Sequence, residues 1–569
     1  MWAAQTEVPA TTMTLNAKQG SWRHCAAAAL LIVAGFYVFW NLGAYYLWDD
    51  EAAQAMLAEQ VWKTGDTSAV VGRNIIAYNQ GSELEGLKDR ANSPLPSYLM
   101  APLMAGHEGS RLFPRLLFAA CGFAFVAFFS WALWREDADG TTWLVFAMAI
   151  LGNAAMFLLF RQARYYGITL LCSLVLGYKY LRWNGSRRSL VGMSLLLFCL
   201  MASHLITYAG VCATLVVDYI AWRRKERPLG WGDWAAIVLP QAVLGAALLS
   251  VWNPFGTGVG GSLFANSFAE RARLFWWNLR DLNANEFICT GLVLGAPLLY
   301  ALRHRCSYLW RGPLAVVIYC ATIALISPKV MRLTWPFADC RYLTPMIPLS
   351  IALGAMVVRL LADRVRWVAL PLGLVAFGTN LLNFGPLLDD RFHPGPRDGF
   401  HAAPVLLAGE LVRPVPGPYG AALEWMSANM PAGASVWVLP GWDNYPLMYH
   451  APQFIYAWQL GNPPAAPFRN LDPIHFYGVK PPDYVVAFGT YVDDACLMMA
   501  REREAGVYYD QVALLPHYWM NLHRPAVIHH AFRIPEVTDP NNYGIYIYRR
   551  KGPLSATNEA AGRGQRGAR

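Results

Sequence analysis

Long apolar runs, separated by short polar or basic segments, recur along the chain from residue 25 to about residue 388. The first run, Cys25 to Trp48, carries no charged residue. Because a transmembrane helix needs roughly 20 apolar residues, each run of about that length predicts a membrane span, and we expect about eleven. The expected spans are 25–48, 111–134, 141–160, 166–182, 189–205, 206–222, 234–252, 287–303, 312–328, 342–360 and 367–388.

Basic residues predict the orientation of these spans, because cytoplasmic loops are enriched in lysine and arginine. Basic clusters precede the first span and follow the fourth, sixth, eighth and tenth. They are Lys18 and Arg23; Arg182, Arg187 and Arg188; Arg223, Arg224, Lys225 and Arg227; Arg303 and Arg305; and Arg359, Arg364 and Arg366. Placing them all inside makes residues 1–24 a cytoplasmic tail and, since the number of spans is odd, puts the C-terminal part outside.

The composition changes near residue 390, where the apolar runs end. Residues 391–417 are rich in proline and glycine and predict a linker. Residues 418–550 show the pattern of a small soluble α/β domain, with a helix at 421–430 and strands at 435–439, 454–458, 484–488 and 543–548. The tail 551–569 is poor in hydrophobic residues, which is typical of disorder.

Composition supports a polytopic membrane protein rather than a soluble one. The 569 residues are 56% hydrophobic and only 15% charged. The net charge of +9 follows from the basic cytoplasmic loops, so it does not indicate a nucleic-acid partner. The ten cysteines show neither metal-ligand spacing nor a disulfide framework.

Three acids, Asp49, Asp50 and Glu51, lie where the first span meets the outer side. Ionisable groups at a membrane boundary indicate a functional site, and clustered carboxylates repel one another, which favours a general base. The alternative is that they cap the following helix, since acids favour helix N-termini. That helix, 51–62, has the pattern of an amphipathic interfacial helix; a Gly-containing polar loop (72–90) and a second short helix from Pro94 follow.

The expected topology places the sequence Arg161-Gln162-Ala163-Arg164-Tyr165-Tyr166 on the same outer side, together with the segment 328–342 that contains Arg341. Arginines kept outside, against the usual bias, indicate an anionic ligand. The alternative is an interfacial anchor, because tyrosine and arginine both favour the headgroup region.

The order of these motifs resembles the GT-C membrane glycosyltransferases, specifically the branch that contains protein O-mannosyltransferases and the lipid A aminoarabinose transferase. The resemblance covers roughly residues 25–390 and predicts a GT-C catalytic domain with outer loops 49–110 and 253–286. The matching motifs are the acidic pair after the first span, Pro94-Leu95-Pro96-Ser97-Tyr98-Leu99, Gly106 to Leu112, the Ala-Arg-Tyr-Tyr turn at 163–166, and Arg341 to Pro348.

The resemblance implies transfer of a sugar from a polyprenyl-phosphate donor to a lipid, protein or glycan acceptor on the outer face of a bacterial inner membrane, with inversion. It places the essential acid on Asp50, with Glu51 beside it and Asp49 able to share the role. Phosphate-binding candidates are Arg161, Arg164 and Arg341, with Tyr165 and Tyr166 as hydrogen-bond donors. No cofactor is required; whether a divalent metal takes part stays open.

One motif departs from that branch. Relatives carry a lysine before Pro-Pro-Leu, whereas this chain has Asn92-Ser93-Pro94-Leu95 with Lys88 upstream, so Lys88 is the remaining phosphate candidate in this loop. The sequence therefore names neither sugar nor acceptor. Two other functions stay open: a transporter or flippase for a lipid-linked sugar, which would carry polar residues near mid-span, and a polysaccharide ligase, which lacks the early acidic pair.

Overall fold

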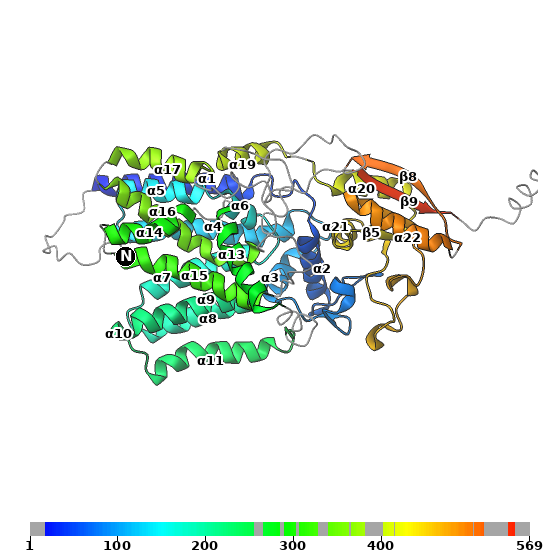
Figure 1. Ribbon diagram of the computed structural model, residues 1–569, viewed down its shortest axis with the longest axis horizontal. Helices are drawn as coiled ribbons and strands as arrows, with labels where there is room; N and C mark the ends of the chain where they lie inside the picture. Colours follow the sequence, from blue (N-terminus) through cyan, green and yellow to red (C-terminus); the bar gives the residue numbers. More distant parts are fainter. Residues whose placement is uncertain are drawn as a thin grey trace, which may run out of the picture.

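The computed structural model describes residues 17–254, 266–284, 290–302, 306–327, 340–363, 366–381, 402–414, 416–504, 506–516 and 544–551. They form a long helical bundle at one end, a five-stranded sheet with helices at the other, and a small layer between them (Figure 1). The tail after Lys551, the glycine-rich stretch 256–261 and most of the segment before Arg341 lie outside the described residues, as do residues 391–401 of the predicted linker. The later part of that linker is described and contains a helix, α19 (Ala403–Val412).

The bundle is built from helices that run mostly along the long axis of the molecule (Figure 1). They are α1 (Ala17–Phe39), α4 (Phe113–Arg135), α5 (Gly140–Leu151), α6 (Ala154–Phe160), α7 (Tyr166–Leu181), α8 (Arg187–Ser203), α9 (Leu205–Asp218), α10 (Arg224–Glu226), α11 (Trp231–Leu248), α13 (Phe268–Ala284), α14 (Thr290–Leu302), α15 (Tyr308–Ile326), α16 (Ile347–Ala362) and α17 (Ala369–Gly378).

Six described helical segments are long and apolar enough to cross a membrane. The pair α5 and α6, bent by 61°, makes a seventh if it forms one broken span. Helices α7 and α17 are apolar but shorter, and the expected spans 287–303 and 367–388 lie partly outside the described residues. The count of eleven therefore stays a prediction.

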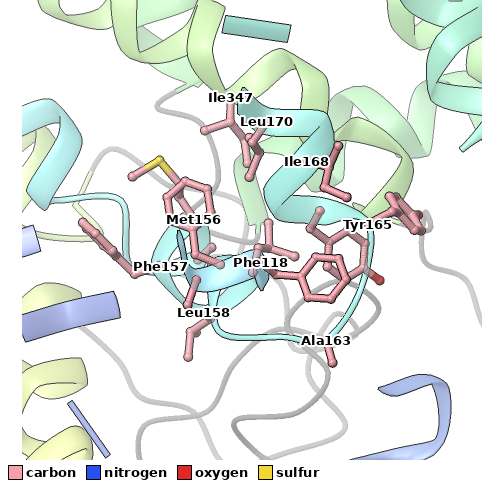
Figure 2. Packing of buried hydrophobic residues seen from close by; sticks show 14 of the residues in the cluster. Phe118, Met156, Phe157, Leu158, Ala163, Tyr165, Ile168, Leu170 and Ile347 are labelled. Atoms are coloured by element: carbon pink, nitrogen blue, oxygen red, sulfur yellow. The ribbon is translucent and has the colours of Figure 1, made fainter. Parts of the chain in front are cut away.

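Close packing holds α4 against the two helices that follow α5. A Cβ atom on Gly122 would lie 2.3 Å from the side chain of Phe160, and one on Gly167 would lie 2.6 Å from the Phe118 carbonyl oxygen. Only glycine permits such an approach. Figure 2 shows Phe118 and its apolar neighbours gathered around the turn between α6 and α7, so a packed core fixes the position of that turn.

The layer between bundle and sheet contains α2 (Asp49–Thr64), α3 (Leu95–Met104) and two hairpins, β1–β2 (Val70–Val71, Asn74–Ile75) and β3–β4 (Leu84–Glu85, Lys88–Asp89). The helix predicted after the acids is confirmed, but the prediction of an amphipathic interfacial helix is wrong. All its residues from Glu51 to Val61 are buried, because α3 and α21 (Asn444–His450) pack against it. The stretch 72–90, predicted as a loop, contains β2 and the whole β3–β4 hairpin.

The sheet has the strand order β6-β5-β7-β9-β8. Strands β5 (Ser435–Leu439), β6 (Ile455–Tyr456) and β7 (Tyr484–Phe488) are parallel, and β9 (Gly544–Arg550) pairs antiparallel with β7 and with β8 (Tyr509–Pro516). The predicted strands lie where the sequence placed them; β8 was missed. Helices α20 (Tyr419–Asn429), α21 and α22 (Val492–Glu504) complete this part, whereas α19 (Ala403–Val412) contacts α6 and accepts hydrogen bonds from Tyr37 and Asn41 at the end of α1.

Hydrogen bonds join the sheet to the β1–β2 hairpin, and α21 to the loop that precedes α2. The side chain of Asn74 donates to the Phe454 carbonyl at 2.9 Å and accepts from the Tyr456 backbone at 2.8 Å. The backbone N–H of Leu47 donates to Nε2 of His450 at 3.2 Å. The C-terminal part of the chain therefore contacts both the loop from which the acid-bearing helix α2 starts and the hairpin that follows this helix.

Candidate active site

The three acids occupy the first turn of α2 and have three different environments. Asp49 accepts a hydrogen bond from the Asp50 backbone at 2.7 Å, and Glu51 accepts one from the Trp48 backbone at 3.3 Å. Negative side chains at a helix N-terminus are favourable, so the helix-capping interpretation describes part of their role. The sequence predicts that the clustered carboxylates repel one another. In the structure this repulsion is offset, because N–H donors and arginine side chains lie next to the carboxylates.

Glu51 is fully buried and holds three segments together. Its Oε1 accepts from Arg115 Nε at 2.9 Å and from the Ala163 backbone at 2.6 Å, while its Oε2 accepts from Arg115 Nη2 at 2.6 Å. Arg115 also donates to carbonyl oxygens of the loop before α2. This geometry argues against a catalytic role for Glu51, because its carboxylate is enclosed by four donors; we interpret it as a structural link.

Asp50 is the acid that remains partly open, with 15% of its side chain exposed. Its Oδ2 lies 3.1 Å from Arg164 Nη2 and 3.1 Å from Arg341 Nη1. Arg164 belongs to the turn between α6 and α7, and Arg341 to a 3-10 helix, Cys340–Met346, that leads into α16. The structure thus brings together one carboxylate and two guanidinium groups from three distant segments.

Two phosphate-binding candidates lie in other environments. The guanidinium of Arg161 donates to the carbonyls of Tyr37, Val38 and Asn41 at 3.0–3.1 Å, where it caps the C-terminal end of α1. Its prediction as a phosphate ligand disagrees with this geometry, since three carbonyl groups hold the cation. Lys88 pairs with Asp66 at 2.8 Å.

Asp66 also receives two hydrogen bonds from Arg90, at 2.7 and 2.9 Å. The Arg90 hydrogen bonds, followed by that of Lys88, hold the pKa of Asp66 well below its usual range. The carboxylate therefore stays ionised and neutralises Lys88, which weakens the case for Lys88 as a phosphate ligand.

Tyr165 lies beside the ion-pair cluster and carries an available donor. Its ring stacks on His204 (4.2 Å between centroids), which in turn stacks on Tyr342 (5.2 Å). The Tyr165 hydroxyl and Arg164 Nε are buried, and neither has a hydrogen-bond partner among the described residues. Tyr166 is fully buried, with its ring 4.6 Å from that of Tyr165. A buried donor without a hydrogen-bond partner lowers stability, which indicates that a ligand accepts hydrogen bonds from these groups.

Two tyrosines that sequence reasoning did not identify reach the same place. The rings of Tyr78, after β2, and Tyr445, in α21, lie 4.5 Å apart. Burial raises the pKa of both hydroxyls, and the charges of Asp49 and Asp50 raise it further. The Tyr78 hydroxyl is buried and unpaired within the described part of the chain. No local pattern marks Tyr445, because it follows Asp50 by almost four hundred residues.

The described residues hold no group of three His, Cys, Asp or Glu side chains arranged to bind a metal ion. Four hydrogen-bond donors surround the Glu51 carboxylate, and two guanidinium groups pair with the Asp50 carboxylate. The oxygens of both acids therefore already face donors or cations of the protein at the positions where a metal ion would bind.

No protein-family model and no curated protein sequence matches the chain. Among solved structures, ArnT from Cupriavidus metallidurans in the apo state aligns with a TM-score of 0.53 at 12% identity, over 94% of this chain and 98% of that one. ArnT bound to undecaprenyl phosphate gives 0.49 over the same shares, also at 12% identity. The archaeal oligosaccharyltransferase AglB from Archaeoglobus fulgidus gives 0.39 at 12% identity, over 83% and 70%.

Of these three alignments, the one with apo ArnT has a TM-score above 0.5, and it shows the fold. It extends over nearly the whole chain, including the part that contains the sheet. The resemblance expected from the sequence is thereby confirmed at the level of architecture: this chain shares its fold with ArnT.

Proposed function

We propose that the chain is an integral-membrane glycosyltransferase that moves a sugar from a polyprenyl-phosphate donor to an acceptor on the outer face of the membrane. The observation that carries the proposal is the pairing of one partly exposed carboxylate, Asp50, with Arg164 and Arg341. A general base and a pair of guanidinium groups are what an attacking hydroxyl and a departing phosphate require.

In the proposed reaction Asp50 accepts the proton of the acceptor hydroxyl while the hydroxyl oxygen bonds to the anomeric carbon. The bond between that carbon and the phosphate oxygen breaks, and the polyprenyl phosphate leaves with the electron pair. Arg164 and Arg341 turn from Asp50 toward this growing negative charge and stabilise it electrostatically. Direct displacement of this kind inverts the anomeric configuration.

Other residues keep these groups in place or complete the site. Glu51 fixes the start of α2 against Arg115, and Arg161 fixes the turn that carries Arg164. The Tyr165 hydroxyl is placed to donate to the phosphate, and we expect Tyr78 to donate to the sugar or the acceptor, since it lies near the Asp50 carboxylate. Asp49 is a second acid able to share the role of base.

We further propose that residues 25–390 form the catalytic domain with about eleven spans, with the N-terminus cytoplasmic and residues 418–550 on the outer face of a bacterial inner membrane. The convergence of Asp50, Arg164 and Tyr445 at one end of the bundle supports this sidedness. The family resemblance of the motifs makes a polyprenyl-phosphate donor the first to test. The acceptor is a lipid, a protein or a glycan.

The decisive test uses purified protein in vesicles supplied with a polyprenyl-phosphate sugar and membrane acceptors. Asp50→Asn should lower release of polyprenyl phosphate by at least about 100-fold, because a general base typically contributes that much. Asp49→Asn is the matched control: a smaller loss assigns the base to Asp50, and an equal loss makes the two acids a shared base. Unimpaired turnover in Asp50→Asn would refute the proposal.

The same preparation separates the alternatives. A transporter would move the labelled donor across the bilayer without consuming it, and a ligase would require a preassembled glycan on its lipid carrier. Mass spectrometry of envelope lipids and glycans, with and without the protein, should then name both substrates, because the donor accumulates while one sugar disappears from an acceptor.

A further inference from the structure

A cavity of about 440 Å³ lies between the C-terminal ends of α4 and α7 and the start of α8. It belongs to the opposite end of the bundle from the acids. Arg115, which binds Glu51, is near the first residue of α4, whereas Arg135, which lines the cavity, is the last. Twenty helical residues span about 30 Å, close to the thickness of a hydrocarbon core. The cavity therefore lies at the other membrane boundary.

One wall of the cavity is aromatic. The rings of Phe128, Trp131 and Tyr178 contact one another, with centroids 5.1–5.5 Å apart. Trp131 remains 39% exposed on the outside of the bundle, so the wall continues toward the position of the lipid chains. Tryptophan and tyrosine at this depth favour the headgroup region of a bilayer.

The cavity carries an excess of positive charge. Its acid, Glu136, is already bound by Arg182 and by the Tyr178 hydroxyl, whose oxygen lies 2.9 Å from Glu136 Oε1. The remaining two cations, Arg135 and Lys179, have no carboxylate partner within the described residues, although the Arg135 guanidinium lies over the Trp131 ring at 5.2 Å. Two cations without a carboxylate partner in the described residues, beside an aromatic wall, fit an anion that also has an apolar part.

We propose that this cavity binds the phosphate headgroup of an anionic membrane phospholipid. Arg135 and Lys179 contact the phosphate, and the acyl chains descend along α4 and α7 past the exposed face of Trp131. The aromatic wall is what distinguishes this site from one for a soluble phosphate, which would gain nothing from it. The bound lipid joins α4 to α7 at the end of the bundle where Glu136 and Arg182 form the direct link.

The test is native mass spectrometry of the full-length protein, released from detergent after incubation with phosphatidylglycerol, phosphatidylcholine or glycerol phosphate. The variant is Arg135→Gln combined with Lys179→Gln. The matched control is Arg224→Gln with Lys225→Gln, which removes the same charge from exposed side chains near α7, because the neighbouring Arg223 donates to the Tyr180 and Leu181 carbonyls.

We expect the wild type and the control to retain phosphatidylglycerol, with roughly 30-fold weaker binding in the cavity variant, since each cation contributes about fivefold at an anionic lipid surface. Equal losses in the cavity variant and the control would overturn the proposal, as would equal retention of phosphatidylcholine. Binding of glycerol phosphate as tight as that of the lipid would also overturn it, by showing a site for soluble phosphate. None of these outcomes depends on transferase activity.

Discussion

Glu59 is a carboxylate on α2 that the proposed reaction does not use, and it should make the protein less stable as the pH rises. Its side chain is 6% exposed, and its Oε1 has no hydrogen-bond partner among the described residues. Burial raises the pKa of Glu59 to about 7, although Lys63 and the Gly109 backbone oppose this shift. The native protein therefore keeps Glu59 neutral at pH values where the unfolded chain ionises it.

The sign and size of the effect follow from linkage. The stabilising effect of the neutral group is complete below the ordinary pKa of 4.5 and is lost as the pH rises toward about 7. The free energy of unfolding changes by at most about 3.5 kcal/mol, because each pH unit between the two pKa values is worth about 1.4 kcal/mol. Glu59→Gln reproduces the neutral form at every pH, so its advantage over the wild type should grow across this window.

The assay is thermal unfolding of detergent-solubilised protein, followed by tryptophan fluorescence between pH 5 and 8.5. At pH 5 the two proteins should unfold at similar temperatures; at pH 8 the variant should unfold a few degrees higher. Glu108→Gln is the control, since Glu108 is 49% exposed and pairs with the same Lys63. A lower unfolding temperature for Glu59→Gln at pH 8 would refute the reasoning.

Three further changes test other parts of the structure. Glu51→Gln leaves the Arg115 guanidinium buried without its counter-charge and should cost about 3–5 kcal/mol of stability, seen as a loss of folded protein; an unchanged unfolding temperature would contradict the link. Burial and nearby arginines lower the pKa of His450 to about 3. The neutral imidazole therefore stabilises the protein fully above its ordinary pKa of 6.5, and this contribution declines as the pH falls toward 3. His450→Gln keeps an acceptor for the Leu47 backbone, so its unfolding temperature should fall less than that of the wild type as the pH is lowered. Tyr78→Phe removes a hydroxyl with no described partner and should leave stability unchanged while lowering kcat/KM about tenfold, as loss of one substrate hydrogen bond would; a change in stability without a change in turnover would assign the hydroxyl to folding.

Local patterns were sufficient for much of the architecture. Apolar runs marked α4 and α15, and the short β-branched and aromatic runs at 435–439 and 484–488 became β5 and β7. Strand β8 escaped because it is an edge strand that carries Asp510 and Gln511 and ends in proline, a composition disfavoured in strands. The burial of α2 could not be predicted from local sequence either, because it depends on packing against α21, which comes from a distant part of the chain.

The parts of the candidate site that depend on the side of the membrane on which a segment lies could be predicted from the sequence. The parts that depend on tertiary packing could not. Placing Arg164 and Arg341 on the side of Asp50 followed from the order of spans, and the structure brings all three together. Sidedness did not reveal that Arg161, three residues before Arg164, turns toward the end of α1. Nor did it reveal Tyr445, because contacts between segments so far apart arise from tertiary packing rather than from any local period.

The pairing of Asp50 with Arg341 joins residues 291 positions apart, so the order of biosynthesis matters to this protein. The ribosome delivers Asp50 early and Arg164 soon afterwards, but Arg341 emerges only once most of the bundle has been made, and Tyr445 later still. During that interval only one of the two arginine partners of Asp50 has been synthesised. A nascent chain halted before Cys340 would carry Asp50 and Arg164 without Arg341, so the candidate site is complete only when synthesis is nearly finished.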